Sequence, residues 1–289
     1  MRTDFSRKHS FIIIGVVYFL AAALGVGVYI LTLPLGAFWI RLLIADVSAT
    51  VLTFIFSLIF KNASVYDPYW SVQPMVILLG LSFGQKITAI KFFLLLAVLF
   101  WGIRLTANWA YTFKSMASED WRYRMLQEKT GKAYPLVNFV GIHMVPTLVV
   151  YLCTLPAAAV ILGSASGNLV SYVGILISIG AATLQGIADI QMHKFRGGGN
   201  GGFIRAGLWK NSRHPNYLGE ILMWWGIGIS SVSTLGLSFA YLLMGAIANT
   251  ALFIFVSIPL AESRQSKKEG FAQYKAETRA LLPFPKHNR

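Results

Sequence analysis

The sequence has little cysteine, little charge and few acidic residues, and each shortage removes a class of protein. Cys153 is the only cysteine among 289 residues, which excludes an intramolecular disulfide and a cysteine-based zinc site. Only 12% of the residues are charged and 56% are hydrophobic, which excludes an ordinary soluble globular domain. This composition, together with a positive mean hydropathy, is typical of polytopic membrane proteins.

The shortage of acidic residues leaves a formal net charge of +14, which raises the question of nucleic-acid binding. The basic residues form short clusters between apolar runs and make no basic helical face or arm, so we expect no nucleic-acid partner. The N-terminal MRTDFSRKHS precedes a long apolar stretch that lacks a small-residue cleavage site. This pattern favours a retained first span over a removed signal peptide.

Apolar runs predict an all-α bundle of seven to eight transmembrane helices, which form a single domain over residues 1–289. About 20 residues are needed for a helix to cross the hydrocarbon of a bilayer. The runs lie at residues 11–33, 37–60, 70–84, 88–109, 137–163, 169–193, 217–233 and 236–259. The third run is short and contains proline and tryptophan, so we expect it to be tilted or only partly crossing. The last two runs predict a tight hairpin around Thr234 and Leu235.

The placement of lysine and arginine predicts the orientation. Eight crossings put both termini on one side, and that side carries 21 of the 25 Lys and Arg residues. The positive-inside rule then places both termini and the polar loops in the cytoplasm. We expect a monomer among membrane lipids, in a bacterial inner membrane or, in a eukaryote, in the membrane of the endoplasmic reticulum.

Polar residues within the apolar runs are candidates for function, because burying them in lipid is costly. Helical spacing places them in two stripes: Gln185, Asp189, His193 and Arg196 on one run, and Asn216, Glu220 and Trp224 on the next. Both stripes descend from the cytoplasmic end, which predicts a polar cavity between the two helices. The alternative is that they only join helices, for example through a pair of Asp189 and Arg104.

The loop between the stripes contains GGGNGG at residues 197–202. Glycine-rich backbone flanked by Arg196, Arg205, Lys210 and Arg213 suits a phosphate or pyrophosphate. The loop lacks the GK[ST] ending of a Walker A motif and follows no predicted strand, which excludes a Rossmann motif as well. A flexible linker is the alternative interpretation.

The stretch SRHPNYLGE (212–220) opens the seventh run. Pro215 fits the first turn of a helix, and His214 and Asn216 lie at its entrance, where free N–H groups favour an anion. Glu220, one turn deeper, is placed to accept a hydrogen bond from a ribose hydroxyl or an amide. The stretch therefore predicts a phosphate-bearing ligand at the cytoplasmic mouth of the cavity.

A second basic and aromatic cluster follows the fourth run at residues 118–132. Trp121 and Tyr123 are candidates to stack on a base, and Arg122 and Arg124 are candidates to hold phosphates. A solvated cytoplasmic helix is the alternative. Asp46 and Arg41 are interpreted as a helix-end feature. His193 and His214 have no evident third ligand, so we predict no metal site.

Several of these stretches resemble the steroid 5α-reductase and sterol reductase superfamily. SRHPNYLGE, followed by an aromatic pair, resembles its C-terminal signature. Further stretches resemble its bacterial branch, the 3-oxo-5-alpha-steroid 4-dehydrogenase C-terminal-like family: YDPYWSVQP (66–74), WGIRLTANW (101–109), EDWRY (119–123) and FAQYKAETRALLPF (271–284). The resemblance covers residues 62–284, a reductase-like core, whereas residues 1–61 are less characteristic.

The resemblance implies a membrane enzyme that uses NADPH to reduce a carbon–carbon double bond conjugated to a ketone, in a steroid-like or other lipid. It implies a cytoplasm-facing cofactor cavity and contacts with the cofactor from Asp189, Arg196, Asn216, Glu220 and the Arg122–Tyr123 pair. Together with the stripes and loops, the candidate cofactor-binding residues are Arg122, Tyr123, Gln185, Asp189, His193, Arg196, Arg205, Arg213, His214, Asn216, Tyr217 and Glu220.

Asp67 falls where the steroid enzymes carry a glutamate that helps to hold the substrate carbonyl. Those enzymes pair the glutamate with a tyrosine, whose place Trp101 takes here, so Tyr66, Tyr69 and Tyr217 are candidate hydroxyl donors. Hydride attack on the β-carbon builds negative charge on the ketone oxygen, which such donors stabilise. The candidate substrate-lining residues are Trp70, Trp101 and Trp224.

The sequence departs from the steroid enzymes at Gln185, where they carry asparagine, and at Ser263 and Lys267, where they carry histidine and tyrosine. The alternative enzyme is an S-adenosylmethionine-dependent isoprenylcysteine carboxyl methyltransferase, which shares the RHP-x-Y element. Its paired C-terminal glutamates are represented here by Glu262 alone. A third hypothesis is a non-catalytic lipid-binding protein.

Overall fold

The computed structural model describes residues 5–199 and 202–284, and this part of the chain is built of helices without a β-strand. The longer helices are α1 (Arg7–Leu31), α2 (Phe38–Ile59), α3 (Tyr69–Ser82), α4 (Ala89–Thr112), α7 (Val145–Leu162), α8 (Leu169–Gly197) and α10 (Pro215–Leu235). The last apolar run is divided into η5 (Leu237–Leu243), α11 (Met244–Leu252), the π-helical turn η6 (Phe253–Ser257) and α12 (Ile258–Gln265). The all-α class predicted from the sequence is confirmed.

Each of the eight apolar runs forms a helical stretch, but not all are long and apolar enough to cross a membrane. Six stretches of the described chain meet that criterion: Arg7–Leu31, Phe38–Ile59, Ala89–Thr112, Trp121–Leu162, Leu169–Gly197 and Leu237–Gln265. Helix α3 has only 14 residues, as its short apolar run predicts. Helix α10 ends at Leu235, where Gly236 takes a positive φ and turns the chain into η5, as the predicted hairpin requires.

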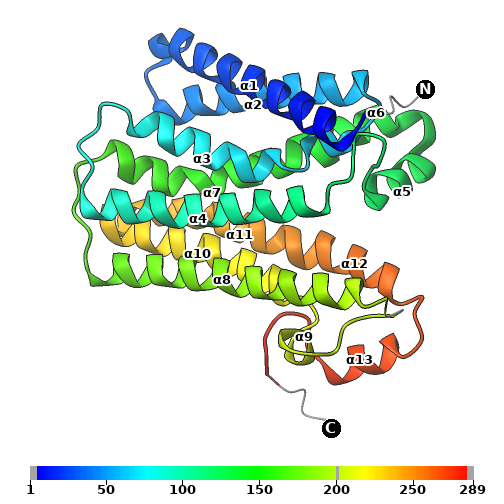
Figure 1. Cartoon of the computed structure of the whole chain (residues 1–289). Helices are drawn as coiled ribbons and strands as arrows, with labels where there is room; N and C mark the ends of the chain where they lie inside the picture. The colour runs from blue at the N-terminus through cyan, green and yellow to red at the C-terminus, as the bar shows by residue number, and fades with distance from the viewer. Residues whose placement is uncertain (1–4, 200–201, 285–289) are drawn as a thin grey trace.

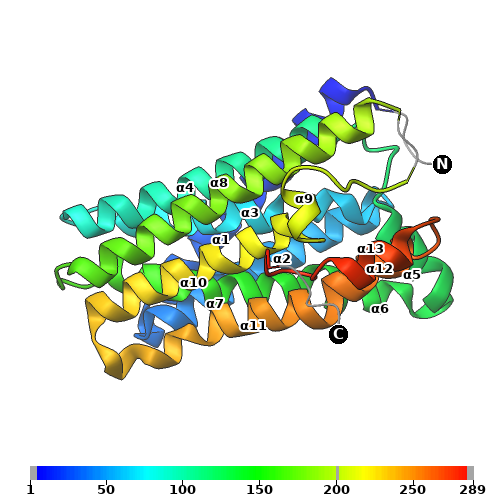
Figure 2. The same ribbon diagram turned by 90° about the horizontal axis from the view of Figure 1, so that it is seen from below.

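The helices lie lengthwise beside one another, with α1 and α2 on one flank and α8 on the other (Figure 1). The short helices α5 (Trp121–Thr130), α6 (Tyr134–Val137), α9 (Leu208–Asn211) and α13 (Phe271–Glu277) gather at the end that also carries the N-terminus (Figures 1 and 2). We call this the polar end of the bundle. It brings together the loops that carry most of the basic residues.

Helices α8 and α10 pack in direct contact because small residues line their common face. A Cβ atom on Gly174 of α8 would lie 2.7 Å from the carbonyl oxygen of Gly226 in α10. A Cβ atom on Gly219 of α10 would lie 2.7 Å from the carbonyl oxygen of Ala181. Small residues allow helix backbones to approach closely in a membrane. No hollow therefore separates the two helices along this contact, where the sequence predicted a polar cavity.

Replacing Gly174 by leucine should force α8 and α10 apart. Overpacking of this kind costs about 1–3 kcal/mol of stability, so we expect a lower midpoint of thermal unfolding in detergent. Gly180→Leu on the same helix is the matched control, because nothing lies within 4 Å of its Cβ position. Equal losses of stability in the two variants would contradict the close packing.

Candidate functional site

Two of the stretches that carried the resemblance meet at the polar end. The turn before η2 (Ala63–Tyr66) is tied to the loop before α5, because the Asn62 amide donates to the carbonyl oxygens of Met116 at 2.6 Å and Ser118 at 3.0 Å. The backbone N–H of Asp120 donates to the Ser64 hydroxyl at 2.9 Å. These bonds fix the first turn of α5 against the corner that leads into α3.

This docking places Asp67 beside Tyr123. The Tyr123 hydroxyl donates to Oδ1 of Asp67 at 2.6 Å. Burial raises the pKa of Asp67 from its ordinary 3.8 to about 7, and the nearby Arg122 charge and the Tyr123 hydrogen bond offset this only in part. Part of the Asp67 surface stays exposed. Asp67 is thus a partly exposed carboxyl group whose raised pKa favours the protonated form up to about pH 7.

The hydroxyls of Tyr66 and Tyr69 are engaged elsewhere. The Tyr66 hydroxyl lies 2.8 Å from that of Thr147 in α7, and the Tyr69 hydroxyl donates to Oδ1 of Asp46 in α2 at 3.1 Å. Neither has a hydrogen bond to Asp67 among the described residues. The hydroxyl beside Asp67 belongs to Tyr123, which the sequence assigned to the cofactor.

The two polar stripes form one network with Arg104 of α4. The Arg104 guanidinium pairs with Asp189 at 2.9 Å and also donates to the side-chain oxygen of Gln185. The Gln185 amide in turn donates to Oε2 of Glu220 at 2.7 Å. The alternative in which these residues join helices therefore accounts for the Asp189–Arg104 pair, and α4, α8 and α10 are linked through it.

Glu220 is fully enclosed by protein donors. The indole N–H of Trp101 donates to its Oε2 at 2.8 Å, and that of Trp224 donates to its Oε1 at 2.9 Å. Glu220 and Trp224 are each 1% exposed, and Trp101 is completely buried. All three residues therefore lie in the core in this structure, whereas the sequence predicted them as cofactor or substrate contacts. Trp70 packs edge-on against Trp101, with ring centroids 6.3 Å apart.

The start of α10 retains groups that face the polar end. The Asn216 side chain hydrogen-bonds to Asp189, while its Oδ1 atom is buried and has no hydrogen-bond partner among the described residues. The Tyr217 hydroxyl lies within electrostatic range of Arg122, Asp120 and Asp189. Tyr217 of α10 is thus coupled electrostatically to charged groups at the start of α5 and in α8.

Basic and aromatic groups also lie at the polar end of the bundle. The guanidinium of Arg122 is exposed and pairs with Asp120 at 2.8 Å. The Arg264 guanidinium of α12 lies 4.4 Å from the centroid of the Trp121 ring. Near the end of α8, Arg196 is exposed, and Nε2 of His193 lies 2.7 Å from the Asn108 side-chain oxygen. Residues 200 and 201 of the glycine-rich loop lie outside the described residues, and Gly199 and Gly202 on either side have positive φ.

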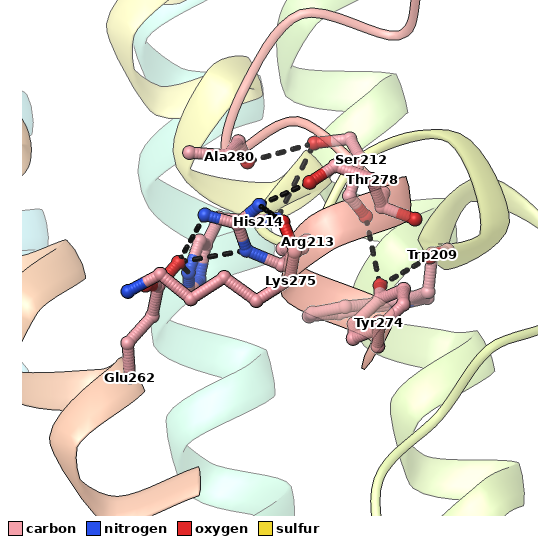
Figure 3. A network of polar contacts seen from close by, with 9 residues as sticks. All are labelled: Trp209, Ser212, Arg213, His214, Glu262, Tyr274, Lys275, Thr278 and Ala280. Carbon is pink, nitrogen blue, oxygen red and sulfur yellow. Dashed lines mark hydrogen bonds and ion pairs between the residues drawn. The ribbon is translucent and has the colours of Figure 1, made fainter. Parts of the chain in front are cut away.

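Arg213 and His214, predicted to bind a phosphate, are instead bound to Glu262 of α12. The Arg213 guanidinium lies 2.6 Å from the Glu262 carboxylate, His214 Nε2 lies 3.3 Å from it and Lys275 Nζ lies 2.7 Å from it (Figure 3). Arg213 is 8% exposed and Glu262 is 6% exposed, so this carboxylate neutralises a buried cation. We call these four residues the Glu262 clamp.

The Glu262 clamp is one of several contacts that attach the C-terminal segment to the residues just before α10 (Figure 3). The backbone N–H groups of Arg213 and His214 donate to the carbonyl oxygens of Arg279 and Ala280, both at 3.0 Å. The Tyr274 hydroxyl donates to the carbonyl oxygen of Trp209. The segment that carries α13 is therefore fastened to the entrance of α10.

Arg205, another predicted phosphate ligand, lies on the outer side of this attachment. It pairs with Glu277 at 2.5 Å, and both side chains are 44% exposed. An open cavity of about 420 Å³ lies here, lined by Arg205, Lys210, Asn211, Tyr274, Glu277, Thr278 and Phe284. Within residues 5–199 and 202–284, no group of three or more His, Cys, Asp or Glu side chains is arranged to hold a metal ion.

Sequence reasoning missed the partners of several site residues. Glu262 was noted only as a lone acid, yet it is the counter-ion of Arg213. A lone acid at the end of an apolar run, with a buried arginine elsewhere, is a signal that points to such a pair. The contact of Asp67 with Tyr123 left no comparable signal in the sequence.

Replacing Glu262 by alanine should release the C-terminal segment. The change leaves Arg213 buried without its counter-charge, and breaking a buried pair in this way costs about 3–5 kcal/mol. We expect trypsin to cleave the variant after Arg264 and Lys268 faster than it cleaves the wild type. Mass spectrometry of the digest measures this rate. Glu277→Ala is the control, because its exposed pair with Arg205 contributes less than about 1 kcal/mol. Equal cleavage of both variants would argue against the clamp.

The pKa of Asp67 predicts a pH dependence of stability. Between about pH 4 and about pH 7 the folded protein keeps a proton that the unfolded chain releases. The contribution of Asp67 to the free energy of unfolding therefore falls as the pH rises through this window. Thermal unfolding of the wild type and of Asp67→Asn should show a stability difference, wild type minus variant, that declines from pH 4 to pH 7. A constant difference would refute the raised pKa.

Comparison with known proteins places the chain in a family. No curated protein and no solved structure matches it. A protein family described as "Protein of unknown function (DUF1295)" matches residues 53–278. The match includes the Asp67–Tyr123 contact, the network of Arg104 and the Glu262 clamp. Because it spans well over half of the 289 residues, the chain belongs to the DUF1295 family.

Proposed function

We propose that the protein is an NADPH-dependent membrane reductase that reduces a carbon–carbon double bond conjugated to a ketone in a steroid-like or other lipid substrate. The observation that carries the proposal is the partly exposed Asp67 carboxyl at the polar end, which is hydrogen-bonded to Tyr123 and whose pKa is raised by burial to about 7. The association of the DUF1295 family with steroid 5-alpha-reductase-like membrane proteins supports it.

The pairing of Asp67 with Tyr123 decides which carboxyl oxygen acts. Because the Tyr123 hydroxyl donates to Oδ1, that oxygen is an acceptor and the proton resides on Oδ2. The protonated Oδ2 then donates to the ketone oxygen of the substrate. As negative charge builds on that oxygen, this hydrogen bond strengthens and lowers the barrier. Above pH 7 the proton leaves Asp67 and this assistance is lost.

The residues of the polar end fit a dinucleotide. The buried Oδ1 atom of Asn216, which has no partner in the described chain, suits an amide donor such as that of nicotinamide. The exposed guanidinium groups of Arg122 and Arg196 suit phosphates. Bound NADPH would supply the hydride. Asn216 would orient the nicotinamide end, and the two arginines would hold the phosphates.

Residues whose polar groups are already bound within the protein support the proposed site and do not contact the ligand in this proposal. Arg104, Asp189 and Glu220 hold α4, α8 and α10 together and thereby keep Asn216 at the entrance of α10. The Glu262 clamp fixes the residues just before Asn216. A supporting frame of this kind is what a bound ligand requires for a fixed geometry.

Ligand-dependent thermal stability tests the proposal against its alternatives. We expect NADPH to raise the unfolding midpoint of the purified protein, since a ligand at a hundredfold excess over Kd stabilises by about 2.7 kcal/mol. S-adenosylmethionine should have no effect. Stabilisation by S-adenosylmethionine alone would favour the methyltransferase, and stabilisation by neither would favour a lipid-binding protein.

Matched variants test which residues the NADPH-dependent rise in the unfolding midpoint depends on. Asn216→Leu should abolish the NADPH-dependent shift, whereas Asn211→Leu, an exposed position at the end of α9, should keep it. Asp67→Asn should retain the shift but lose NADPH consumption in the presence of a 3-oxo-Δ4 steroid used as probe. Loss of the shift in Asp67→Asn would assign that residue to cofactor binding instead.

A further inference from the structure

A second polar centre lies in α2, around Asp46. Asp46 is 5% exposed, and its carboxylate accepts hydrogen bonds from the Tyr69 hydroxyl at 3.1 Å and from the Gln73 amide. No Lys or Arg pairs with Asp46 in the described part of the chain. Arg41, its predicted neighbour, instead places its guanidinium 4.1 Å from the centroid of the Tyr29 ring. The interpretation of Asp46 and Arg41 as a helix-end feature is therefore wrong.

The Asp46 centre continues through buried hydroxyls. The Thr50 and Thr147 hydroxyls lie 3.0 Å apart, and Thr147 also meets the Tyr66 hydroxyl at 2.8 Å. Tyr66, Thr50 and Thr147 are each at most 1% exposed. Helix α2 is thus joined to α3 through Asp46 and to α7 through Thr50. Thr147 of α7 is in turn hydrogen-bonded to Tyr66.

These anchors flank Asp67 on both sides in the sequence. Tyr66 precedes it and Tyr69 follows Pro68, and the two rings stack with centroids 5.3 Å apart. The Tyr18 hydroxyl of α1 also donates to the carbonyl oxygen of Val65 at 2.8 Å. The backbone around Asp67 is therefore held from α1, α2 and α7, while its carboxyl is left to meet Tyr123 of α5.

We propose that Asp46 is a positioning residue for the proposed reductase: through Tyr69 and Gln73 it holds the corner at Asp67 in place against Tyr123. This inference rests on the proposed function only for the use made of Asp67. An apolar side chain at position 46 gives up both acceptors, so the start of α3 shifts and water reaches Asp67. A buried carboxyl group is costly unless its oxygens are hydrogen-bonded, and Tyr69 and Gln73 supply these bonds to Asp46.

The titration of Asp67 measures this positioning without any cofactor. Infrared difference spectroscopy follows the protonated carboxyl band of the purified full chain, and the loss of a band in Asp67→Asn assigns it. The charged and titratable groups facing Asp67 are Tyr18, Tyr66, Asp120, Arg122 and Tyr123, and all of them are retained in the variants.

In Asp46→Leu we expect the titration midpoint of Asp67 to fall by about one pH unit or more toward the ordinary aspartate value, because water then reaches the Asp67 carboxyl. Asp46→Asn keeps an acceptor for Tyr69 and should restore most of the wild-type midpoint. Tyr69→Phe, which loses one hydroxyl, should shift the midpoint in the same direction as Asp46→Leu and serves if that variant does not fold. Ser48→Leu, whose hydroxyl binds only its own helix, is the control and should leave it unchanged.

An unchanged midpoint in folded Asp46→Leu or in Tyr69→Phe would overturn the inference. The outcome is separable from that of the proposed function. If the midpoint shifts as expected but NADPH fails to bind the wild type, the positioning of Asp67 stands and the reductase proposal falls.

Discussion

A polar group inside an apolar helix bundle must find a partner within the protein, since lipid offers none, and the arrangement of this bundle depends on that constraint. Arg104 of α4 meets it by binding both Asp189 and Gln185 of α8. Gln185 in turn donates a hydrogen bond to Glu220 of α10, whose carboxylate also accepts hydrogen bonds from two buried indole N–H groups. A shift of one turn in any of the three helices would leave a charge unpaired. The network therefore fixes the register of the helices as well as joining them.

The same constraint separates supporting residues from residues that remain ready for a ligand. Glu220 and Arg213 have their hydrogen-bonding groups engaged by protein. Asn216 keeps a buried oxygen without a described hydrogen-bond partner, and Asp67, which hydrogen-bonds to Tyr123 and Ser64, stays partly exposed. These available groups lie at the polar end, where the helix contact lined by Gly174 no longer controls the spacing. The proposed reductase chemistry belongs there for this reason.

The sequence predicted most of the fold because hydrophobicity and helix punctuation are local properties. The 14-residue α3 and the turn at Gly236 follow directly from composition. The candidate site was less predictable, since partners depend on how helices pack. Small residues such as Gly174 bring α8 against α10, which closes the predicted cavity along that contact. The stripes correctly grouped Gln185 with Asp189, but no sequence pattern indicated that Tyr123 would contact Asp67.

A structure of the protein determined with NADPH tests the central claim most directly, namely that the polar end of the bundle is a dinucleotide site. The account predicts that the nicotinamide amide lies within hydrogen-bonding distance of Asn216 Oδ1, on the side that faces Asp67 and Tyr123. It also predicts that the Arg104 network and the Glu262 clamp remain intact around it. NADPH bound in the outer cavity beside Arg205, or a polar end in which Asn216 and Asp67 contact no part of it, would contradict the account.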